Sequence, residues 1–398
     1  MNSNTVRRAL LAAPAIGLAV LAGAFVALGA NSNANARAVC PGPPADYAHC
    51  HALVVTDARG NPLASRSPTG LSPGTIESAY LFSTSLTAGV GKTIAIVDAY
   101  DDPSAESDLG VFSSTYGLPA CTTANGCFAK VNQIGGTSYP QKNAGWALEI
   151  SLDIQWAHAI APGAHILLVE ASSNSFANLL AAEDYAKAHA KYVSNSWGGS
   201  EFSSESGYDS HFSQSGVSFF VSSGDAGLPA EYPSASPNVI SVGGTTLHFS
   251  GGAFTSETGW SSGGGGCSAY ESKATAQTTG SVNCAGKRAT PDVSLDADPS
   301  SGVSVYDTTR YQGQSGWFTI GGTSASSPMW AARSAAAGAV VDASYVYGSS
   351  ITYRVHMTRW TNPPALLRSR ALRPVVRAAM KSYIKKMLRN LTTYASKH

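Results

Sequence analysis

Residues 165–196 have the sequence HILLVEASSNSFANLLAAEDYAKAHAKYVSNS, and the fold class follows from the order of the elements in it. His165–Glu170 and Tyr192–Ser196 are short runs that favour strands, and Phe176–Ala190 between them favours a helix. A strand, a helix and a second strand in this order are typical of two parallel strands joined by a crossover helix. The stretch therefore predicts a parallel sheet with a helix packed on it.

The same alternation continues on both sides of this stretch. The predicted strands are nearly continuous hydrophobic runs, as in strands buried on both faces of a parallel sheet. Further strands are expected at Thr93–Asp98, Val217–Ser222, Val239–Val242 and Trp317–Ile320, and further helices at Asn143–Ile160 and Ser326–Val340. The chain is therefore predicted to be an α/β protein, with a parallel sheet and helices on both faces. In such sheets, active sites gather outside the carboxyl ends of the strands.

The composition fits this class and excludes several others. Charged residues make up 13% of the 398 residues, about half of the ~25% typical of soluble domains. Disorder driven by charge is excluded, and neither a collagen repeat nor heptads occur. The charge is also divided unevenly, because residues 345–398 contain 11 Lys and Arg but no Asp or Glu. These 54 residues form a basic tail on an acidic body.

The first residues have the pattern of a secretory signal. Arg7 and Arg8 precede an apolar run, residues 9–30, and small-x-small sites follow at residues 34–36 and 36–38. We expect residues 1–37 to be a signal peptide and the protein to be secreted, with an uncleaved membrane anchor as the alternative. Residues 38–75 are expected to be irregular, residues 76–344 to form the α/β domain, and residues 345–398 to be an atypical tail.

All six cysteines lie after the predicted signal, at positions 40, 50, 121, 127, 267 and 284. An even number in an exported chain predicts disulfides, although six cysteines allow 15 connectivities. Short-range pairing (40–50, 121–127 and 267–284) would close three surface loops. No C-x-x-C spacing indicates a metal site.

The segment from Gly321 to Pro328, GGTSASSP, is predicted to lead from a strand into a helix. Its glycines permit a tight turn and the close approach of a substrate. Ser324 would lie at the helix N-terminus, where free N–H groups favour developing negative charge, and Pro328 suits an early helical position. This is a suitable place for a nucleophilic serine, although a capped helix with small residues is the simpler interpretation.

A nucleophilic serine needs a base, and the sequence offers acids rather than a histidine. None of the nine histidines lies in an HGTH-type segment after the first strand, which ends at Asp98. Glu149 and Asp153 are four residues apart on a predicted helix, so they share one face. Buried together, they would share a proton and could accept one from a serine. A solvated acidic face is the alternative.

Asp225 ends another predicted strand, in the turn SSGDAG. Aspartate is common in turns for local reasons. A protonated aspartate could instead donate a hydrogen bond to an oxyanion.

Together these motifs resemble the sedolisin family of serine-carboxyl peptidases, acid-acting relatives of subtilisin. The family's E-x-x-x-D helix motif is met by Glu149 and Asp153, its G-T-S-x-S signature by residues 322–326, and its S-G-D turn by Asp225. The resemblance covers about Leu71 to Ser344. It implies a subtilisin-like fold, with Ser324 as nucleophile, Glu149 as general base and acid, Asp153 orienting Glu149, and Asp225 as oxyanion-hole donor. It also implies that one segment pairs with extended substrate: Ser194, Asn195, Ser196, Trp197 and Gly198.

Two features depart from the family pattern. Sedolisins usually carry a large N-terminal prodomain, whereas only about 40 residues separate the signal from the catalytic body here, too few to support a core. The family's C-terminal calcium site also lacks a counterpart, because no acid follows Asp342. We therefore expect no cofactor. The abrupt switch to an Arg-rich sequence in the tail is typical of a reading-frame change in the gene. A basic amphipathic helix on an anionic membrane is the alternative.

The predicted function is that of a secreted serine-type peptidase acting on polypeptides at acidic pH, as a monomer and without a nucleic-acid partner. An inactive sedolisin-like protein that binds peptides or cell-wall material is the first alternative. A histidine-dependent, subtilisin-like hydrolase is the second, and it requires a histidine near Ser324.

Overall fold

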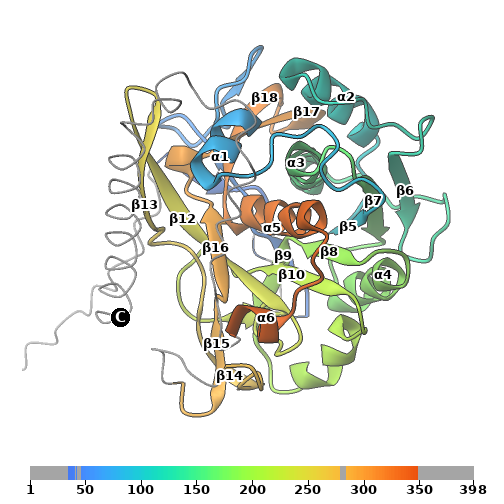
Figure 1. Ribbon diagram of the computed structural model, residues 1–398, viewed down its shortest axis with the longest axis vertical. Helices are drawn as coiled ribbons and strands as arrows, with labels where there is room; N and C mark the ends of the chain where they lie inside the picture. The colour runs from blue at the N-terminus through green and yellow to red at the C-terminus, as the bar shows by residue number, and fades with distance from the viewer. Residues whose placement is uncertain (1–34, 41, 43–45, 278–283, 348–398) are drawn as a thin grey trace, which may run out of the picture.

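The computed structural model describes residues 35–40, 42, 46–277 and 284–347; most of the predicted signal peptide and nearly all of the basic tail lie outside them. The main sheet has eight strands in the order β13-β12-β10-β8-β5-β7-β6, with β16 beside β12 (Figure 1). All neighbours are parallel except β13, which returns antiparallel from β12. The strands are β5 Thr93–Ala99, β6 Phe128–Asn132, β7 His165–Ala171, β8 Tyr192–Asn195, β10 Ser218–Ser222, β12 Ile240–Ser250, β13 Ala253–Gly259 and β16 Val293–Asp296.

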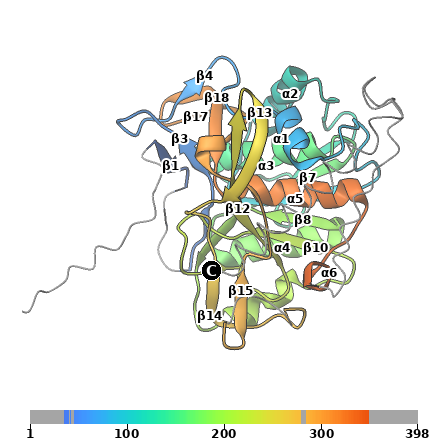
Figure 2. The same cartoon turned by 60° about the vertical axis from the view of Figure 1, so that its left-hand side comes forward.

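Helices cover both faces of this sheet, which confirms the predicted α/β class. α3 (Ala144–Ile160) and α5 (Thr323–Ala337) pack against each other on one face. α4 (Phe176–His189) packs on β5 and β7 from the other face (Figure 2). α3 is buried from Trp146 to Ile160, because it lies between α5, the sheet and further elements. Two further helices, α1 (Pro73–Tyr80) and α2 (Ala105–Tyr116), were not predicted from the sequence.

The strand predicted at Trp317–Ile320 exists, but it does not belong to the parallel sheet. It is part of β18 (Gln314–Gly321), which pairs antiparallel with β17 (Val303–Tyr311) in a separate five-stranded sheet. Gln312 and Gly313 connect them with φ values of 50° and 83°. Positive φ at both central residues makes a two-residue hairpin turn, so the strand returns beside its predecessor. The other predicted strands are confirmed, although β12 continues well beyond Val242.

The N-terminal stretch that was expected to be irregular contains short paired strands. The disulfide Cys40–Cys50 closes its first loop, and the pairs Cys121–Cys127 and Cys267–Cys284 complete the short-range connectivity. β3 pairs with β1 and β18, and β2 pairs with β9, so partners far along the chain order this stretch. The remaining elements are β1 Ala36–Ala38, β2 His49–Cys50, β3 Leu53–Val55, β4 Ala64–Ser65, β9 Trp197–Ser200, β11 Glu231–Tyr232, β14 Gly266–Ser272, β15 Lys287–Thr290, α6 Ala343–Tyr347, and the 3₁₀ helices Glu205–Phe212 and Pro299–Ser301.

Among the described residues, no helix has the length and apolar character needed to cross a membrane.

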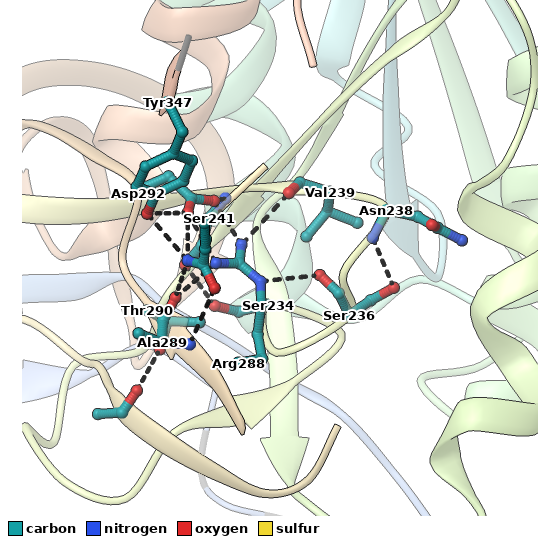
Figure 3. Close-up of polar contacts among 12 residues, drawn as sticks. Ser234, Ser236, Asn238, Val239, Ser241, Arg288, Ala289, Thr290, Asp292 and Tyr347 are labelled. Atoms are coloured by element: carbon teal, nitrogen blue, oxygen red, sulfur yellow. Dashed lines mark hydrogen bonds and ion pairs between the residues drawn. The ribbon is translucent and has the colours of Figure 1, made fainter. Parts of the chain in front are cut away.

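A buried ion pair between Arg288 and Asp292 lies where β15 meets the start of β12 (Figure 3). The guanidinium of Arg288 donates to both carboxylate oxygens of Asp292, and neither side chain is exposed to solvent. Arg288 also donates to the carbonyls of Ser236 and Val239. Asp292 accepts from the Ser241 amide at 2.8 Å and the Tyr347 hydroxyl at 2.7 Å. Each buried charge therefore has several partners.

We expect Arg288→Ala to lower the free energy of unfolding by about 3–5 kcal/mol, because it leaves Asp292 buried without its counter-charge. Urea-induced unfolding followed by circular dichroism measures this. Arg310→Ala, at an exposed position of β17, is the matched control and should change the free energy by less than about 0.5 kcal/mol. Equal effects of the two substitutions would contradict the role assigned to the pair.

Candidate active site

The turn before α5 brings the proposed nucleophile into the interior. Gly322 has φ = 97°, and a Cβ at this position would lie 2.1 Å from the His51 carbonyl oxygen and 2.6 Å from Asp225 Oδ2. Only glycine fits such a position. α5 begins at Thr323, three residues earlier than predicted, so Ser324 lies in its first turn and is fully buried.

The backbone and the side chain of Ser324 are both held by polar contacts. Its amide donates to the His51 carbonyl at 3.0 Å, and its hydroxyl donates to the Ser196 carbonyl at 3.2 Å. Pro328 lies inside α5 rather than in its first turn, which corrects the prediction. Proline has no N–H for the carbonyl four residues before it. That carbonyl belongs to Ser324, and it accepts from the Ser196 hydroxyl at 3.4 Å instead.

Glu149 and Asp153 do not form a solvated acidic face. Both are fully buried, and together with Asp98 they form a cluster in which one carboxylate oxygen from each residue lies within 4.8 Å of the others. None of these oxygens has a hydrogen-bond partner among the described residues. Burial, and then the charge of Asp153, raises the pKa of Glu149 well above its usual range, although the nearby Ser324 hydroxyl opposes the rise.

The other two acids of this cluster respond in the same way. Burial raises the pKa of Asp153 well above its usual value. Burial and the charges of Asp153 and Glu170 do the same for Asp98. The cluster therefore retains protons at pH values where exposed carboxyls are ionised, and it lies beside a serine hydroxyl.

Asp225 approaches the same helix end from the loop after β10. Its Oδ1 accepts from the Thr323 amide at 2.7 Å and from the Thr323 hydroxyl at 3.0 Å. Its Oδ2 is buried without a partner among the described residues and faces the turn at Gly322. Burial raises the pKa of Asp225 to about 7, against the opposing effects of His51 and Thr323. A protonated Oδ2 is thus available as a donor.

The segment predicted to bind substrate lies mostly inside the protein. The Ser194 hydroxyl bonds to Ser327, and the Trp197 indole donates to the Val97 carbonyl, so these two side chains support the core. Asn195 is also fully buried. Both edges of β9 are already paired, one with β11 and the other with β2. The strand edge that was expected to be free for substrate, at Ser196 to Gly198, is thus already paired with another part of the chain.

His51 and Glu231 also lie near the site, and the sequence motifs did not predict them. His51 is buried, with Nδ1 2.7 Å from the Ser222 hydroxyl and Nε2 3.0 Å from Glu231 Oε2. Burial lowers the pKa of His51, but the Glu231 and Asp225 carboxylates outweigh it, and the pKa is raised. Because its ring bonds to these partners rather than to Ser324, His51 does not take the place of a triad histidine. No local motif marks either residue.

The α/β fold, with a serine and paired acids at one helix end, is that of a subtilisin-like serine hydrolase. Comparison of the chain with known proteins agrees with this class. Residues 131–353 match the subtilase family, which is more than half of the chain. Pseudomonas sedolisin, a serine-carboxyl proteinase solved in complex with pseudo-iodotyrostatin, superposes with a TM-score of 0.59 and 28% identity, over 71% of this chain and 85% of that one.

Two curated relatives point to the same group. Kumamolisin from Bacillus sp. (strain MN-32) is 31% identical over 306 residues, which covers 67% of this chain and 52% of the relative. Sedolisin from Pseudomonas sp. (strain 101) is 39% identical over 140 residues, covering 29% and 23% respectively. The chain belongs to the subtilase family, as a protein of the sedolisin type. It spans about half the length of kumamolisin and less of the other curated relatives.

The calcium site expected in such proteins would fall in the tail, after residue 347 and outside the described residues.

Buried acids should make the protein most stable under acidic conditions. Burial raises the pKa of Glu183 on α4 from 4.5 to about 8 and that of Asp307 on β17 to about 9. Between the ordinary and the raised value, the folded state binds more protons than the unfolded state, so stability falls as the pH rises. We expect the free energy of unfolding to decrease from about pH 4.5 to pH 8, by roughly 1.4 kcal/mol per pH unit for each extra proton bound.

Urea unfolding at several pH values measures this slope. Glu183→Gln keeps the shape of the side chain but cannot ionise, so it should flatten the slope and stabilise the protein at pH 8. Glu257→Gln, at an exposed position of β13, should leave the slope unchanged. A wild-type protein more stable at pH 8 than at pH 5 would refute the prediction.

Proposed function

We propose that the chain is a secreted serine-carboxyl peptidase that hydrolyses polypeptides at acidic pH. The observation that carries the proposal is the buried acid cluster beside Ser324, at the N-terminus of α5. Membership of the subtilase family and the likeness to sedolisin support a serine-type peptidase. The three disulfides support an oxidising, extracellular location.

In the proposed mechanism, Ser324 Oγ attacks the carbonyl carbon of the substrate. Its proton passes to Glu149, which accepts it in the form of the cluster where Asp153 and Asp98 hold the shared protons and Glu149 is ionised. Glu149 later gives the proton to the leaving amine, as general acid–base catalysis requires. Asp153 shares the burial of Glu149 and keeps the proton within the pair. Water then hydrolyses the acyl-enzyme with Glu149 as base.

The negative charge that develops on the substrate oxygen needs donors. The Ser324 amide, which lies in the first turn of α5, is one candidate, and the protonated carboxyl of Asp225 is the other. The second donor exists only while Asp225 keeps its proton. Because its pKa is about 7, we expect activity to be lost on the alkaline side of the profile.

Ser324→Ala and Glu149→Gln should each reduce peptidase activity at pH 4 by at least about 10³-fold, because each removes a group that the chemical step uses. Hydrolysis of a denatured protein substrate, followed by release of new amino groups, measures the rates. Ser334→Ala, at a buried position further along α5, is the matched control and should retain activity. Activity that survives Ser324→Ala would reject the mechanism, and a folded, wholly inactive wild type would favour a binding protein.

The oxyanion role of Asp225 can be tested by the pH profile of two variants. Asp225→Ala removes the donor and should lower kcat by about 10²–10³-fold at pH 4. Asp225→Asn keeps an N–H donor that does not titrate, so its activity should no longer fall as the pH rises through 7. Identical alkaline limbs in Asp225→Asn and the wild type would show that another group sets this limb.

A further inference from the structure

Two histidines and a glutamate converge on one point beside β9. His49 lies on β2, His51 follows that strand, and Glu231 lies on β11, which pairs with the other edge of β9. His51 Nε2 is 3.0 Å and His49 Nε2 is 3.7 Å from the same oxygen, Glu231 Oε2. A tetrahedral zinc ion, with bonds of about 2.0–2.2 Å, separates its ligand atoms by about 3.3–3.6 Å. The two spacings bracket this range.

The tautomer of His51 suits a metal ligand. The Ser222 hydroxyl donates to the Asn195 carbonyl at 3.4 Å, so it accepts from His51 Nδ1, which lies 2.7 Å away. With a proton on Nδ1, the ring directs Nε2 at Glu231. An acceptor on the far nitrogen is the usual companion of a metal-bound histidine, because it fixes the ring and makes the other nitrogen more basic.

The charges at this point attract a cation. Burial raises the pKa of Glu231, but the neighbouring imidazoles outweigh it and hold the pKa below its usual value, so the carboxylate is ionised. Burial and the charge of His51 lower the pKa of His49 to about 4, although Glu231 opposes them, so His49 keeps a free lone pair at neutral pH. A proton between His51 and Glu231 satisfies only one of the two imidazoles, whereas a divalent cation can bind both.

Solvent reaches this point from one side. The side chains of His49 and Glu231 are 27% and 12% exposed, whereas that of His51 is not exposed. Two glycines leave room around the ligand atoms: a Cβ at Gly198 would lie 3.1 Å from His51 Nε2, and a Cβ at Gly224 would lie 2.8 Å from Glu231 Oε1. An ion can therefore enter beside His49 and keep a water molecule on that side.

Among the described residues, three groups bring one potential ligand atom from each of three side chains within 4.8 Å of one another. In one of them, two of the atoms are the sulfurs of the Cys121–Cys127 disulfide, which are not thiolates. Another is the acid cluster beside Ser324, which has no nitrogen ligand and holds protons. Of these groups, the one around Glu231 combines two imidazole nitrogens with an ionised oxygen, as open zinc sites do.

We propose that His49 Nε2, His51 Nε2 and Glu231 Oε2 bind one Zn²⁺ ion, with water from the solvent side as the fourth ligand. Imidazole and carboxylate together favour zinc and its neighbouring transition metals, whereas Ca²⁺ and Mg²⁺ prefer oxygen ligands. The ion takes the place of the proton between His51 and Glu231, and that proton goes to solvent. Zn²⁺ binding here does not require Ser324 to be a nucleophile.

The ion joins segments that β9 separates. β2 and β11 pair with opposite edges of β9, so an ion bound to side chains from both sides ties the N-terminal stretch to β11. The His51 amide donates to the Ser196 carbonyl at 3.1 Å, and the His51 carbonyl accepts from the Ser324 amide at 3.0 Å. Bound Zn²⁺ therefore holds the N-terminal stretch against the start of α5, and the stretch should open less often when the site is filled.

Isothermal titration calorimetry with zinc chloride at pH 7 measures the binding, using the untagged full chain with Ser324→Ala, which excludes hydrolysis by the serine. We expect one ion per chain. His49→Ala and Glu231→Gln should each raise the Kd at least about 100-fold, since loss of an outer-shell partner alone costs about 10- to 100-fold. Ser222→Ala, which removes such a partner, should raise it by about 10-fold. His248→Ala, at an exposed position of β12, is the matched control and should leave the Kd unchanged.

Hydrogen exchange locates the ion independently of the calorimetry. In the Ser324→Ala protein, Zn²⁺ at about 100 times its Kd should slow exchange of the His51 amide by about 100-fold, because the ion binds the closed stretch and not the open one. Adding His49→Ala should remove this effect, and thermal unfolding verifies that each variant is folded. His49 is the safest ligand to replace, because its side chain is partly exposed.

Three results would overturn the inference: a folded protein that does not bind Zn²⁺, equal binding in the wild-type site and in His49→Ala or Glu231→Gln, and binding that does not slow exchange at His51. None of them bears on the proposed peptidase activity, which the Ser324 and Glu149 variants test separately.

Discussion

The packing of α3 against α5 is the constraint on which the site depends, because it removes Asp98, Glu149 and Asp153 from water. An isolated buried carboxylate costs several kcal/mol, and these three oxygen pairs have no partners among the described residues. The carboxyls avoid this cost by staying protonated, so the interface between the two helices contains acids that keep their protons. The same contact places these acids beside Ser324, which lies on α5 itself. Stability and chemistry thus depend on one interface.

Two residues of the local sequence, Gly322 and Pro328, fix the position of the first turn of α5. Gly322 allows the chain to turn against the His51 carbonyl, where any side chain would collide. Pro328 leaves the Ser324 carbonyl without its helical donor, and Ser196 supplies one from the sheet. Ser196 also accepts from Ser324 through its own carbonyl. The first turn of the helix is therefore fixed to the end of β8 by two reciprocal bonds, which orient the serine.

The sequence predicted the parallel sheet and its helices because a strand buried on both faces and a long apolar helix differ in length and pattern. It also predicted Ser324, Glu149, Asp153 and Asp225 as one group through three short motifs, and the structure brings all four to one end of α5. The prediction placed Trp317–Ile320 in the wrong sheet. A hydrophobic run does not show which strand it will pair with, and the hairpin turn at Gln312 and Gly313 was overlooked. His51 and Glu231 lie 180 residues apart, and no periodicity connects such a pair.

The path of the N-terminal segment explains how so short a stretch can be ordered against the site. β2 has two residues and β3 has three, which is too little for either to persist alone. β2 pairs with β9, while β3 pairs with β18, in register with Ile320 and Gly321. β18 leads directly into the turn that carries Ser324. The bond between His51 and Ala52 lies where the chain passes from one sheet to the other. A tethered segment reaches a high effective concentration, so a few backbone bonds and one ion pair are sufficient to hold it.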